Sequence, residues 1–388
     1  MIRVAFLIAF SDRLLGQLNY FRNLFEALNC LDNKKIEPIV FTGDAVDEKL
    51  LKDFPSVELV NTPLLNRKSP LWFSHKILQR ILPRDFLLEQ LLAKHDISVL
   101  SHSGTLGRNS PIKTIAWIPD FQHKHLTNLF KKVELKYRDQ IHTKYCREST
   151  CLLLSSYDAL NDLKIFYPGF EDKTKVLHFV AGPLADLDLP DIVNLGKKYK
   201  FNPPYFHLPN QFWAHKNHKV VIEALRILKE KGIKVIVILT GRTEDPRQSD
   251  LYNSLMAKVE AYNLSGSFLP IGVVPYNELI SLMRNSIALI NPSLFEGWSS
   301  TVEEAKSIGK RIILSDIPIH REQSPPGGLY FNPDDPEMLA NQMKIIIDSN
   351  SEEEKKLQAD AERNLMARKI AFAETYQKIV LDTLNFHQ

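Results

Sequence analysis

Short apolar runs alternate with longer stretches of helical periodicity along most of the chain. The first run, residues 2–10, contains β-branched residues, and a helical pattern follows it at residues 20–28. A run that is apolar throughout and bounded by polar loops predicts a strand buried on both faces of a sheet. In the first half of the chain such runs predict strands at 2–10, 36–41, 57–60, 97–100, 112–118, 151–154 and 175–180. Strands that alternate with helices imply parallel βαβ units.

The pattern changes between Gly182 and Pro204, where Gly-Pro, Leu-Pro and Pro-Pro pairs interrupt a stretch without strong periodicity. We place the connection between two domains there. A second series of strands follows, at 205–209, 233–239, 267–271, 287–290 and 311–314, and the chain ends in a charged helical tail. The pattern therefore predicts two doubly wound α/β domains with a cleft between them. In such sheets, ligands bind outside the carboxyl ends of the strands.

The composition fits this fold and argues against several other classes of protein. A chain of 388 residues is too long for one ordinary core, and 44% hydrophobic with 24% charged residues is usual for a globular protein. The net charge of +3 is too small to suggest a nucleic-acid partner. Three cysteines without a C-x-x-C pair argue against a disulfide framework and a zinc site.

The N-terminal apolar run bears on cellular location. Residues 2–10 are similar to the core of a signal peptide, but the run is short, lacks a small-residue cleavage site and stops at Ser11. No uninterrupted apolar stretch of the sequence approaches the roughly 20 residues that a membrane span needs. We therefore expect a cytoplasmic protein, and peripheral contact with the inner face of the cell membrane is left open.

One stretch, residues 291–309, combines several features of a ligand site. It follows the apolar run 287–290, passes through a loop rich in Pro, Ser and Gly, and enters a helix that Gly309 can end. Glu296 lies in the loop and Glu304 lies eight positions on, inside the helix. A strand, a small-residue loop and a helix N-terminus form the geometry that binds phosphate or sugar groups in open α/β sheets.

A purely structural interpretation of the same stretch is also open. Thr301-Val-Glu-Glu304 fits a capping box, in which Thr301 caps the helix and Glu304 caps back. This interpretation does not explain Glu296 or the small residues beside it. A loop there leaves the backbone N–H groups of residues 297–300 free to meet a pyrophosphate, while a carboxylate accepts hydrogen bonds from sugar hydroxyls.

The whole string resembles a known signature. Pro292-Ser-Leu-Phe-Glu296-Gly-Trp, followed by Glu304-Ala, is similar to the E-x7-E signature of retaining, nucleotide-sugar-dependent glycosyltransferases of family 4, which have the GT-B fold. Segments 210–218, 272–274 and 330–337 also fit that family's layout. The resemblance implies two Rossmann-like domains facing across a cleft. It implies an acceptor-binding domain at 1–182, a donor-binding domain at 183–370 and a C-terminal helix at 371–388 that packs back towards the first domain.

The resemblance also implies roles for individual residues. Lys216 would bind the diphosphate, Glu296 the sugar hydroxyls and Glu304 the ribose, while His123, after Ile118-Pro-Asp-Phe-Gln122, would lie near the reacting sugar. A fixed cation beside the phosphates stabilises the charge that develops as the glycosidic bond breaks. The implied catalytic residues are His123, Glu296 and Lys216. The implied donor-binding residues are Arg242, Val273, Gly297, Trp298, Ser299, Ser300 and Glu304, and the implied acceptor-binding residues are Gly16, Asn19 and Asp120.

For Lys216 and His123 the alternatives are a solvated lysine and a structural histidine. Two positions depart from the family pattern. Gln211 stands where an arginine is usual, and Arg242 is a candidate to supply that cation. Gln17 stands where a second glycine is usual, which leaves a close approach of phosphate to the backbone open. We expect no metal and no other cofactor, because the pair His215 and His218 lacks a carboxylate partner nearby in the sequence.

Two basic stretches bear on partners. Residues 66–84 mix aromatic and aliphatic residues with Lys68, Lys76, Arg80 and Arg84, and residues 124–147 add further lysines and arginines. Basic amphipathic elements of this kind suit an anionic lipid surface. The alternative is an ordinary amphipathic helix whose apolar stripe faces the core.

The expected function is that of a retaining glycosyltransferase. It would transfer a hexose-type sugar from a nucleotide diphosphate sugar to a glycan or lipid-linked acceptor in cell-surface polysaccharide synthesis (O-antigen, capsule or exopolysaccharide). Two alternatives stay open. One is a non-catalytic subunit that binds a nucleotide sugar or a glycan, which the departure at Gln211 allows. The other is a nucleotide-sugar epimerase, which would need acid and base carboxylates that the sequence does not identify.

Overall fold

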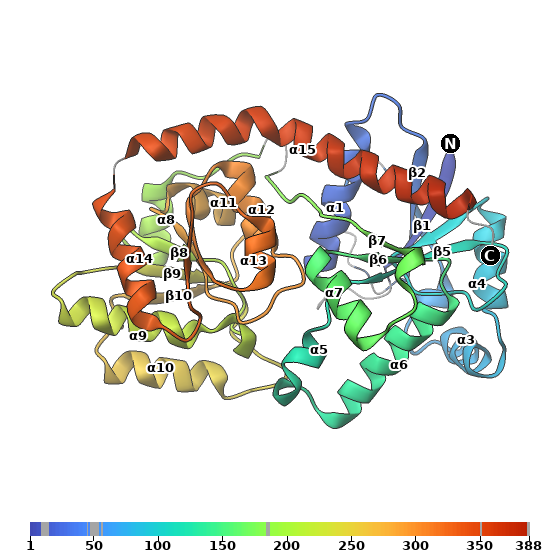
Figure 1. The fold of residues 1–388 in the computed structure, drawn as a ribbon, viewed down its shortest axis with the longest axis horizontal. Helices are drawn as coiled ribbons and strands as arrows, with labels where there is room; N and C mark the ends of the chain where they lie inside the picture. The colour runs from blue at the N-terminus through green and yellow to red at the C-terminus, as the bar shows by residue number, and fades with distance from the viewer. Residues whose placement is uncertain are drawn as a thin grey trace. The chain divides into compact units, whose positions relative to one another are not determined.

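The computed structural model describes residues 1–8, 15–44, 46, 54, 55, 57–183, 187–349 and 351–385, and Figure 1 labels its helices and strands. The chain divides into two compact units. Unit 1 consists of residues 1–127, 131–180 and 366–388, and unit 2 of residues 128–130 and 181–365. Each unit is built on a parallel sheet.

Within the described residues, the sheet of unit 1 has seven parallel strands in the order β3-β2-β1-β4-β5-β6-β7. The strands are β1 (Ile2–Ile8), β2 (Ile36–Thr42), β3 (Glu58–Asn61), β4 (Val99–Ser101), β5 (Lys113–Ile118), β6 (Cys151–Leu154) and β7 (Thr174–Val176). The helices include α1 (Leu15–Asn29), α3 (Pro70–Ile81), α4 (Phe86–Lys94), α5 (Gln122–His125), α6 (Lys132–Glu148) and α7 (Tyr157–Phe166). The strand order reverses between β1 and β4, which makes this place the topological switch point of the sheet.

The core of unit 1 explains the position of β1. Phe6 is fully buried and packs edge-on against Phe21 and Phe25 of α1, with ring centroids 5.3 and 4.9 Å apart. The last part of α15 (Ser351–Asn385) belongs to the same unit, because Tyr376 is buried and its hydroxyl donates to Ser101 Oγ at 2.8 Å. A buried tyrosine needs such a partner for its hydroxyl.

The sheet of unit 2 has the order β10-β9-β8-β11-β12-β13, again with parallel pairing, and its switch point lies between β8 and β11. The strands are β8 (Phe206–Leu208), β9 (Val237–Thr240), β10 (Phe268–Gly272), β11 (Leu289–Asn291), β12 (Ile312–Ser315) and β13 (Gly328–Phe331). The helices include α8 (Ile192–Tyr199), α9 (His218–Glu230), α10 (Leu251–Ala261), α11 (Tyr276–Asn285), α12 (Ser300–Ile308), α13 (Pro318–Gln323) and α14 (Pro336–Asp348).

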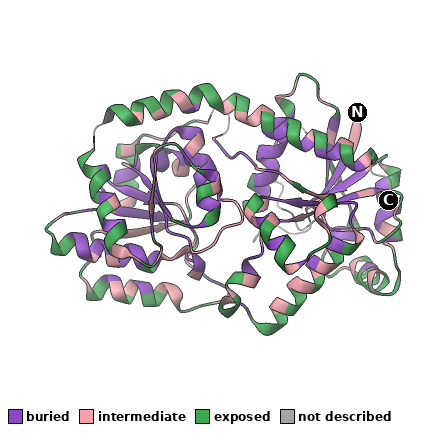
Figure 2. Ribbon diagram, in the orientation of Figure 1, coloured by how far each residue is buried: buried purple, intermediate pink, exposed green. Residues whose placement is uncertain are grey.

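Both faces of the second sheet are covered. One hydrophobic cluster joins the sheet to α9, α10 and α14, and another joins β11 and β12 to α11 and α12. The inner strands β8, β9, β11 and β12 are accordingly buried, while the outer faces of the helices are exposed (Figure 2). Two doubly wound parallel α/β units were predicted from the alternation of apolar runs and helical periodicity, and the structure confirms this architecture.

Three local predictions are corrected. Helix α1 begins at Leu15, five residues before the helical pattern predicted at 20–28. The run at 233–239 forms a strand only from Val237, and the strand predicted at 175–180 ends at Val176. The end of the predicted strand 2–10 and the residues that follow it lie partly outside the described part of the chain.

Candidate functional site

Two loops meet at the switch point of unit 2. The loop after β8 carries a short 3-10 helix, Ala214–Lys216, and the loop after β11 contains Glu296. The amide of Leu294 donates to the carbonyl of His215 at 2.7 Å and ties the two loops together. As a result, Lys216 Nζ and Glu296 Oε1 lie 2.5 Å apart. The structure thus brings together two of the residues that the sequence singled out.

The ion pair between Lys216 and Glu296 is largely buried. The side chains of Lys216 and Glu296 are 15% and 11% exposed. Burial alone would raise the pKa of Glu296, but the charge of Lys216 and hydrogen bonds from Lys216 and Ser293 lower it to about 2. The carboxylate is therefore ionised at neutral pH, and the site presents a fixed cation beside a fixed anion.

Buried amides hold the two loops in register. Asn210 Nδ2 donates to Asn291 Oδ1 at 3.0 Å, and Asn291 Nδ2 donates to Ser299 Oγ at 2.9 Å. Both asparagine side chains are buried, so each bond satisfies a group that would otherwise lack a partner in the interior. The chain of bonds runs from the end of β8, through the end of β11, to the start of α12.

The N-terminus of α12 differs from the predicted capping box. Ser299 is the N-cap, and its Oγ accepts from the amide of Val302 at 3.4 Å. Thr301 lies inside the helix, so neither Thr301 nor Glu304 occupies the position that a capping box requires, and that interpretation is wrong. Glu304 is buried on the helix, and its predicted contact with a ribose stays a prediction. Gly309 ends the helix with φ at 65°, as predicted.

Gln323 of α13 fixes the backbone of Ser299, a role that the sequence did not indicate. Its Oε1 accepts from Ser299 N at 3.0 Å, and its Nε2 donates to Ser299 O and Glu303 Oε1, each at 3.0 Å. The amide of Ser299 is therefore already bonded, which corrects the expectation that the amides of residues 297–300 are all free. Gly297 and Trp298 are half-buried in the preceding loop, and Ser300 is exposed at the start of α12.

Replacing Gln323 with leucine tests this clamp. The substitution leaves the buried N–H of Ser299 without its partner and removes one of the two hydrogen bonds to the Ser299 carbonyl, which still accepts from the amide of Glu303 at 3.2 Å. We expect the free energy of unfolding to fall by about 2 kcal/mol. Urea unfolding measures the change, and Gln248→Leu, at an exposed glutamine of the same unit, is the matched control. An unchanged unfolding midpoint for Gln323→Leu would show that the clamp does not stabilise the loop.

Arg242 and Val273 lie in neighbouring loops at the same edge of the sheet. Gly241 has φ at 138°, and a Cβ there would lie 2.7 Å from the carbonyl oxygen of Asn210. Arg242 O accepts from the amide of Phe212 at 2.9 Å. The backbone of Arg242 is therefore adjacent to the Gln211 segment, as its proposed replacement of the family's arginine requires. Val273 is 63% exposed, directly after β10.

In unit 1, His123 is a buried residue at the inner side of a partly exposed polar cluster. It is 1% exposed, and its Nε2 lies 3.0 Å from Asp139 Oδ1, which also contacts Lys124 Nζ at 2.7 Å and Tyr167 OH at 2.6 Å. Burial lowers the pKa of His123, which favours the neutral imidazole. The catalytic role of His123 stays a prediction. Asp120 Oδ1 accepts from the amide of Gln122 at 2.9 Å, at the start of α5.

The predicted acceptor residues Gly16 and Asn19 lie exposed in the first turns of α1. A Cβ added to Gly16 would meet no atom within 4 Å among the described residues, so packing does not require glycine there. Gln17, between them, lines a cavity of about 330 Å³ in unit 1, together with residues of α3 and of the loop after β4. Within the part of the chain that the structure describes, no group of three or more His, Cys, Asp or Glu side chains is placed to hold a metal ion.

Comparison with known proteins adds independent information on unit 2. Residues 197–364 match the family model described as glycosyl transferases group 1. The matched segment contains all six described strands of unit 2, Lys216 and Glu296. The match supports a glycosyltransferase.

Two curated relatives are similar over part of the chain. The O-antigen chain mannosyltransferase of Salmonella typhimurium is 27% identical over 245 residues, which span 63% of each chain. The N,N'-diacetylbacillosaminyl-diphospho-undecaprenol alpha-1,3-N-acetylgalactosaminyltransferase of Campylobacter jejuni is 30% identical over 128 residues, which span 32% of this chain and 28% of that protein. The alignments thus cover less than two thirds of either relative.

Solved structures resemble the whole chain in fold. A glycosyltransferase from Rickettsia africae has a TM-score of 0.70 at 17% identity and covers 98% of both chains. HepE of Anabaena, in complex with UDP and glucose, has a TM-score of 0.69 at 15% identity and covers 100% of both. WaaG, a glycosyltransferase of lipopolysaccharide biosynthesis, has a TM-score of 0.60 at 14% identity and covers 97% of this chain and 95% of that chain. These likenesses confirm the GT-B type of fold. Among the described residues, no helix has the length and apolar character to cross a membrane.

Proposed function

We propose that the protein is a retaining glycosyltransferase that moves a hexose-type sugar from a nucleotide diphosphate sugar to a glycan or lipid-linked acceptor. The reaction would belong to the synthesis of a cell-surface polysaccharide. The main support for the proposal is the nearly buried ion pair between Lys216 and Glu296 at the switch point of unit 2. Both residues lie in the segment that matches the family model.

The pair suits a nucleotide diphosphate sugar as donor. The leaving diphosphate gains negative charge as the glycosidic bond breaks, and Lys216 is the cation that would stabilise it. In the free protein Glu296 neutralises Lys216. Binding of the donor would break the ion pair between Lys216 and Glu296. Phosphate oxygens would then accept hydrogen bonds from Lys216, and sugar hydroxyls would donate to Glu296. The N-terminus of α12 would contribute its partial positive charge to the same phosphates.

Retention is inferred from the resemblance to family 4. In that picture the acceptor attacks from the face that the diphosphate leaves, and a phosphate oxygen takes the proton of the acceptor hydroxyl. His123 would hydrogen-bond the transferred sugar. Its Nε2 is engaged by Asp139, and its buried Nδ1 has no hydrogen-bond partner among the described residues. In this proposal a sugar hydroxyl would donate to Nδ1. No metal is needed in this scheme.

The substrate class rests on the relatives. One is by name an O-antigen chain mannosyltransferase, and the other acts by name on a diphospho-undecaprenol and transfers N-acetylgalactosamine. These names support a hexose-type sugar, a lipid-linked or glycan acceptor and a role in surface polysaccharide synthesis. We further infer that the protein acts at the cytoplasmic side of the membrane, where nucleotide sugars and lipid-linked acceptors would meet.

The proposal is tested by incubating the protein with UDP-, GDP- and dTDP-sugars in the presence of a bacterial lipid extract. We expect one donor to release its nucleoside diphosphate only when the extract is present, with the anomeric configuration of the product, read by NMR, unchanged from the donor. An inverted product would overturn the retaining mechanism. Tight nucleotide binding without release from any donor would favour the non-catalytic alternative, and conversion of the donor sugar without transfer would favour the epimerase.

A further inference from the structure

Glu296 uses one of its two carboxylate oxygens in the hydrogen bonds of the free protein. Lys216 Nζ donates to Oε1 at 2.5 Å, and Ser293 Oγ donates to the same oxygen at 2.7 Å. Among the described residues, no donor contacts Oε2. Because Oε2 is also not one of the fully enclosed polar atoms without a partner in that part of the chain, it is open to solvent. Oε2 is therefore the oxygen that a ligand can reach.

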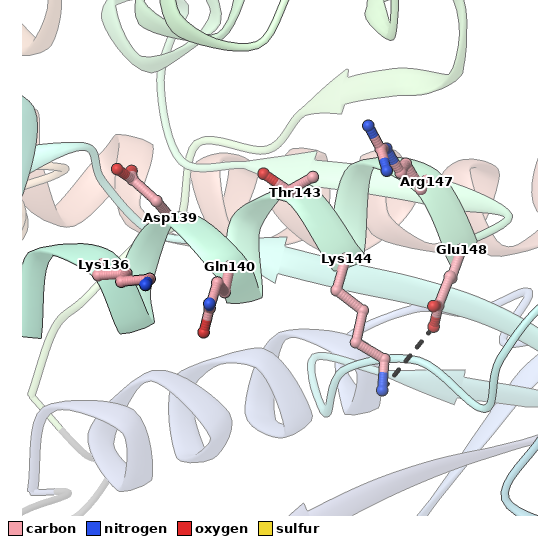
Figure 3. Close-up of a pocket in the computed structure, with 7 residues that line it drawn as sticks. All are labelled: Lys136, Asp139, Gln140, Thr143, Lys144, Arg147 and Glu148. Carbon is pink, nitrogen blue, oxygen red and sulfur yellow. Dashed lines mark ion pairs between the residues drawn. The ribbon is translucent and has the colours of Figure 1, made fainter. Parts of the chain in front are cut away.

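A carboxylate that is engaged through one oxygen does not by itself mark a ligand site. Glu148 lines a groove of about 680 Å³ along α6 (Figure 3). Its Oε2 accepts from Thr105 Oγ1 at 2.8 Å and lies 3.9 Å from Lys144 Nζ. The side chain of Glu148 is 25% exposed, so water can satisfy its other oxygen. What distinguishes Glu296 is the way in which the protein fixes the serine that holds it.

The backbone around Ser293 is held by hydrogen bonds on both sides of its carbonyl group. The Ser293 carbonyl accepts from Ser315 Oγ, and the amide of the next residue, Leu294, donates to the carbonyl of His215 at 2.7 Å. Ser315 is held in turn by His320, whose Nδ1 lies 2.9 Å from the Ser315 carbonyl oxygen. Ser293 and Ser315 are both fully buried. The backbone therefore places the Ser293 side chain at a fixed point beside Glu296.

The hydroxyl group of Ser293 has one hydrogen and two acceptors within reach. Glu296 Oε1 and Asn291 Oδ1 both lie 2.7 Å from Ser293 Oγ. Asn291 Oδ1 already accepts from Asn210 Nδ2 at 3.0 Å, so it does not depend on the serine. The ionised carboxylate of Glu296 is the stronger acceptor, because hydrogen bonds to a charged group are stronger than those between neutral groups. In the free protein Ser293 therefore donates to Glu296.

The bond from Ser293 gains importance when Lys216 turns away from Glu296. In the proposed reaction Lys216 leaves Glu296 for the phosphates of the donor. Ser293 is then the one hydrogen-bond donor left to Glu296 among the described residues. Without this bond the Glu296 side chain would gain rotational freedom, and fixing it again would cost conformational entropy when the donor binds. With Oε1 held by Ser293, Oε2 stays at one place in the site.

We propose that Ser293 is the positioning residue for Glu296: its hydroxyl group holds Oε1, so that Oε2 accepts from a hydroxyl of the donor sugar. Ser293 touches neither the substrate nor the reacting atoms and acts through Glu296 alone. Its effect is confined to the sugar, because the nucleoside diphosphate part of the donor makes no contact with Glu296 in this arrangement. The inference rests on the proposed function, since it assigns the residue that orders the sugar-binding carboxylate.

A comparison of two affinities tests this role. Isothermal titration of the full-length protein gives the Kd of UDP-glucose, GDP-mannose and dTDP-glucose, and of UDP, GDP and dTDP. For a nucleotide sugar that binds, Ser293→Ala should weaken binding at least tenfold, which is the usual size of a lost hydrogen bond to a charged group. The affinity for the matching nucleoside diphosphate should change less than twofold. A merely structural role would weaken both affinities alike, and that result would overturn the proposal.

Two further variants separate this effect from a general loss of stability. Ser286→Ala removes another buried hydroxyl group of unit 2, which donates to the Met283 carbonyl at 2.8 Å, and should leave both affinities unchanged. In a protein that carries Glu296→Gln, Ser293→Ala should weaken binding of the nucleotide sugar less than threefold, because the residue through which it acts has lost its charge. An undiminished tenfold effect in that protein would contradict the inference.

The two proposals fail in different ways. If none of the six compounds binds to the unchanged protein, the proposed function fails, and the role of Ser293 falls with it. If a nucleotide sugar binds and Ser293→Ala leaves its affinity unchanged, the positioning role is removed and the glycosyltransferase stays in place.

Discussion

Replacing Lys216 with methionine is expected to lower the rate of sugar transfer at least a thousandfold, or by about 4 kcal/mol of transition-state stabilisation. The substitution keeps the length of the side chain and removes the cation that would meet the leaving diphosphate. Release of nucleoside diphosphate at saturating donor measures the effect. Lys219→Met, at an exposed lysine in the first turn of α9, is the matched control and should keep full activity.

A loss of stability has to be separated from this loss of catalysis. Without Lys216, the carboxylate of Glu296 is left nearly buried without its counter-ion, which destabilises a protein by about 3–5 kcal/mol when the pair is fully buried. The double variant Lys216→Met, Glu296→Gln removes both charges and should recover most of the stability while staying inactive. Full activity of Lys216→Met would remove the phosphate role of this lysine.

Acidification is expected to destabilise the unchanged protein more than the Glu296→Gln variant. The pKa of Glu296 is about 2, against an ordinary value of 4.5, because Lys216 stabilises the ionised form. A carboxyl group whose pKa is lower in the folded than in the unfolded protein stabilises the folded state at every pH above the unfolded-state pKa. That stabilisation is lost as the pH falls through the interval from 4.5 to 2. The interval corresponds to about 3 kcal/mol.

Urea unfolding of both proteins between pH 7 and pH 3 measures this difference. The difference in unfolding free energy between the protein with Glu296 and the Glu296→Gln variant should become smaller as the pH falls. Only the protein with Glu296 has a carboxylate that titrates at this position. A constant gap over the whole range would show that Glu296 is not ionised and paired in the folded protein. We also expect the variant to transfer sugar at least a hundredfold more slowly, because an amide accepts hydrogen bonds from sugar hydroxyls less strongly than a carboxylate.

The strands were predictable because most of them are buried on both faces. The runs at 36–41, 151–154 and 311–314 lie within one residue of the observed strands β2, β6 and β12. In a parallel sheet covered by helices, both faces of a strand are buried, so its residues are apolar at consecutive positions. Such a run can be recognised in the local sequence. The edge strand β13 was missed, because it begins at the last residue of the run Pro325-Pro-Gly-Gly328 and three of its four residues are only partly buried.

Features that depend on contacts distant in the sequence could not be predicted in the same way. Gln323 reaches back 24 residues to Ser299, and nothing in its local sequence indicates that contact. The N-cap of α12 is Ser299 rather than Thr301, because several residues in the run Ser299-Ser-Thr301 can cap a helix and tertiary hydrogen bonds decide between them. Periodicity identified α3 as amphipathic, but it could not decide which face meets solvent.

The candidate site was predictable where a motif places residues after two strands. Lys216 and Glu296 are 80 residues apart, and the resemblance predicted that both contact the donor. The structure shows that they form an ion pair. Gln17 was noticed only as a departure from the family pattern. The cavity that it lines with residues of α3 required the fold, because α1, α3 and the β4 loop come from separate parts of the chain.

The central claim is that Lys216 and Glu296 mark the site of a nucleoside diphosphate. Isothermal titration of UDP, GDP and dTDP into the unchanged protein and into Lys216→Met tests it most directly, because binding requires neither acceptor nor turnover. We predict saturable binding of at least one of these nucleotides to the unchanged protein and at least a tenfold loss of affinity in the variant. Equal affinity of the two proteins, or binding of none of the three nucleotides, would contradict the claim.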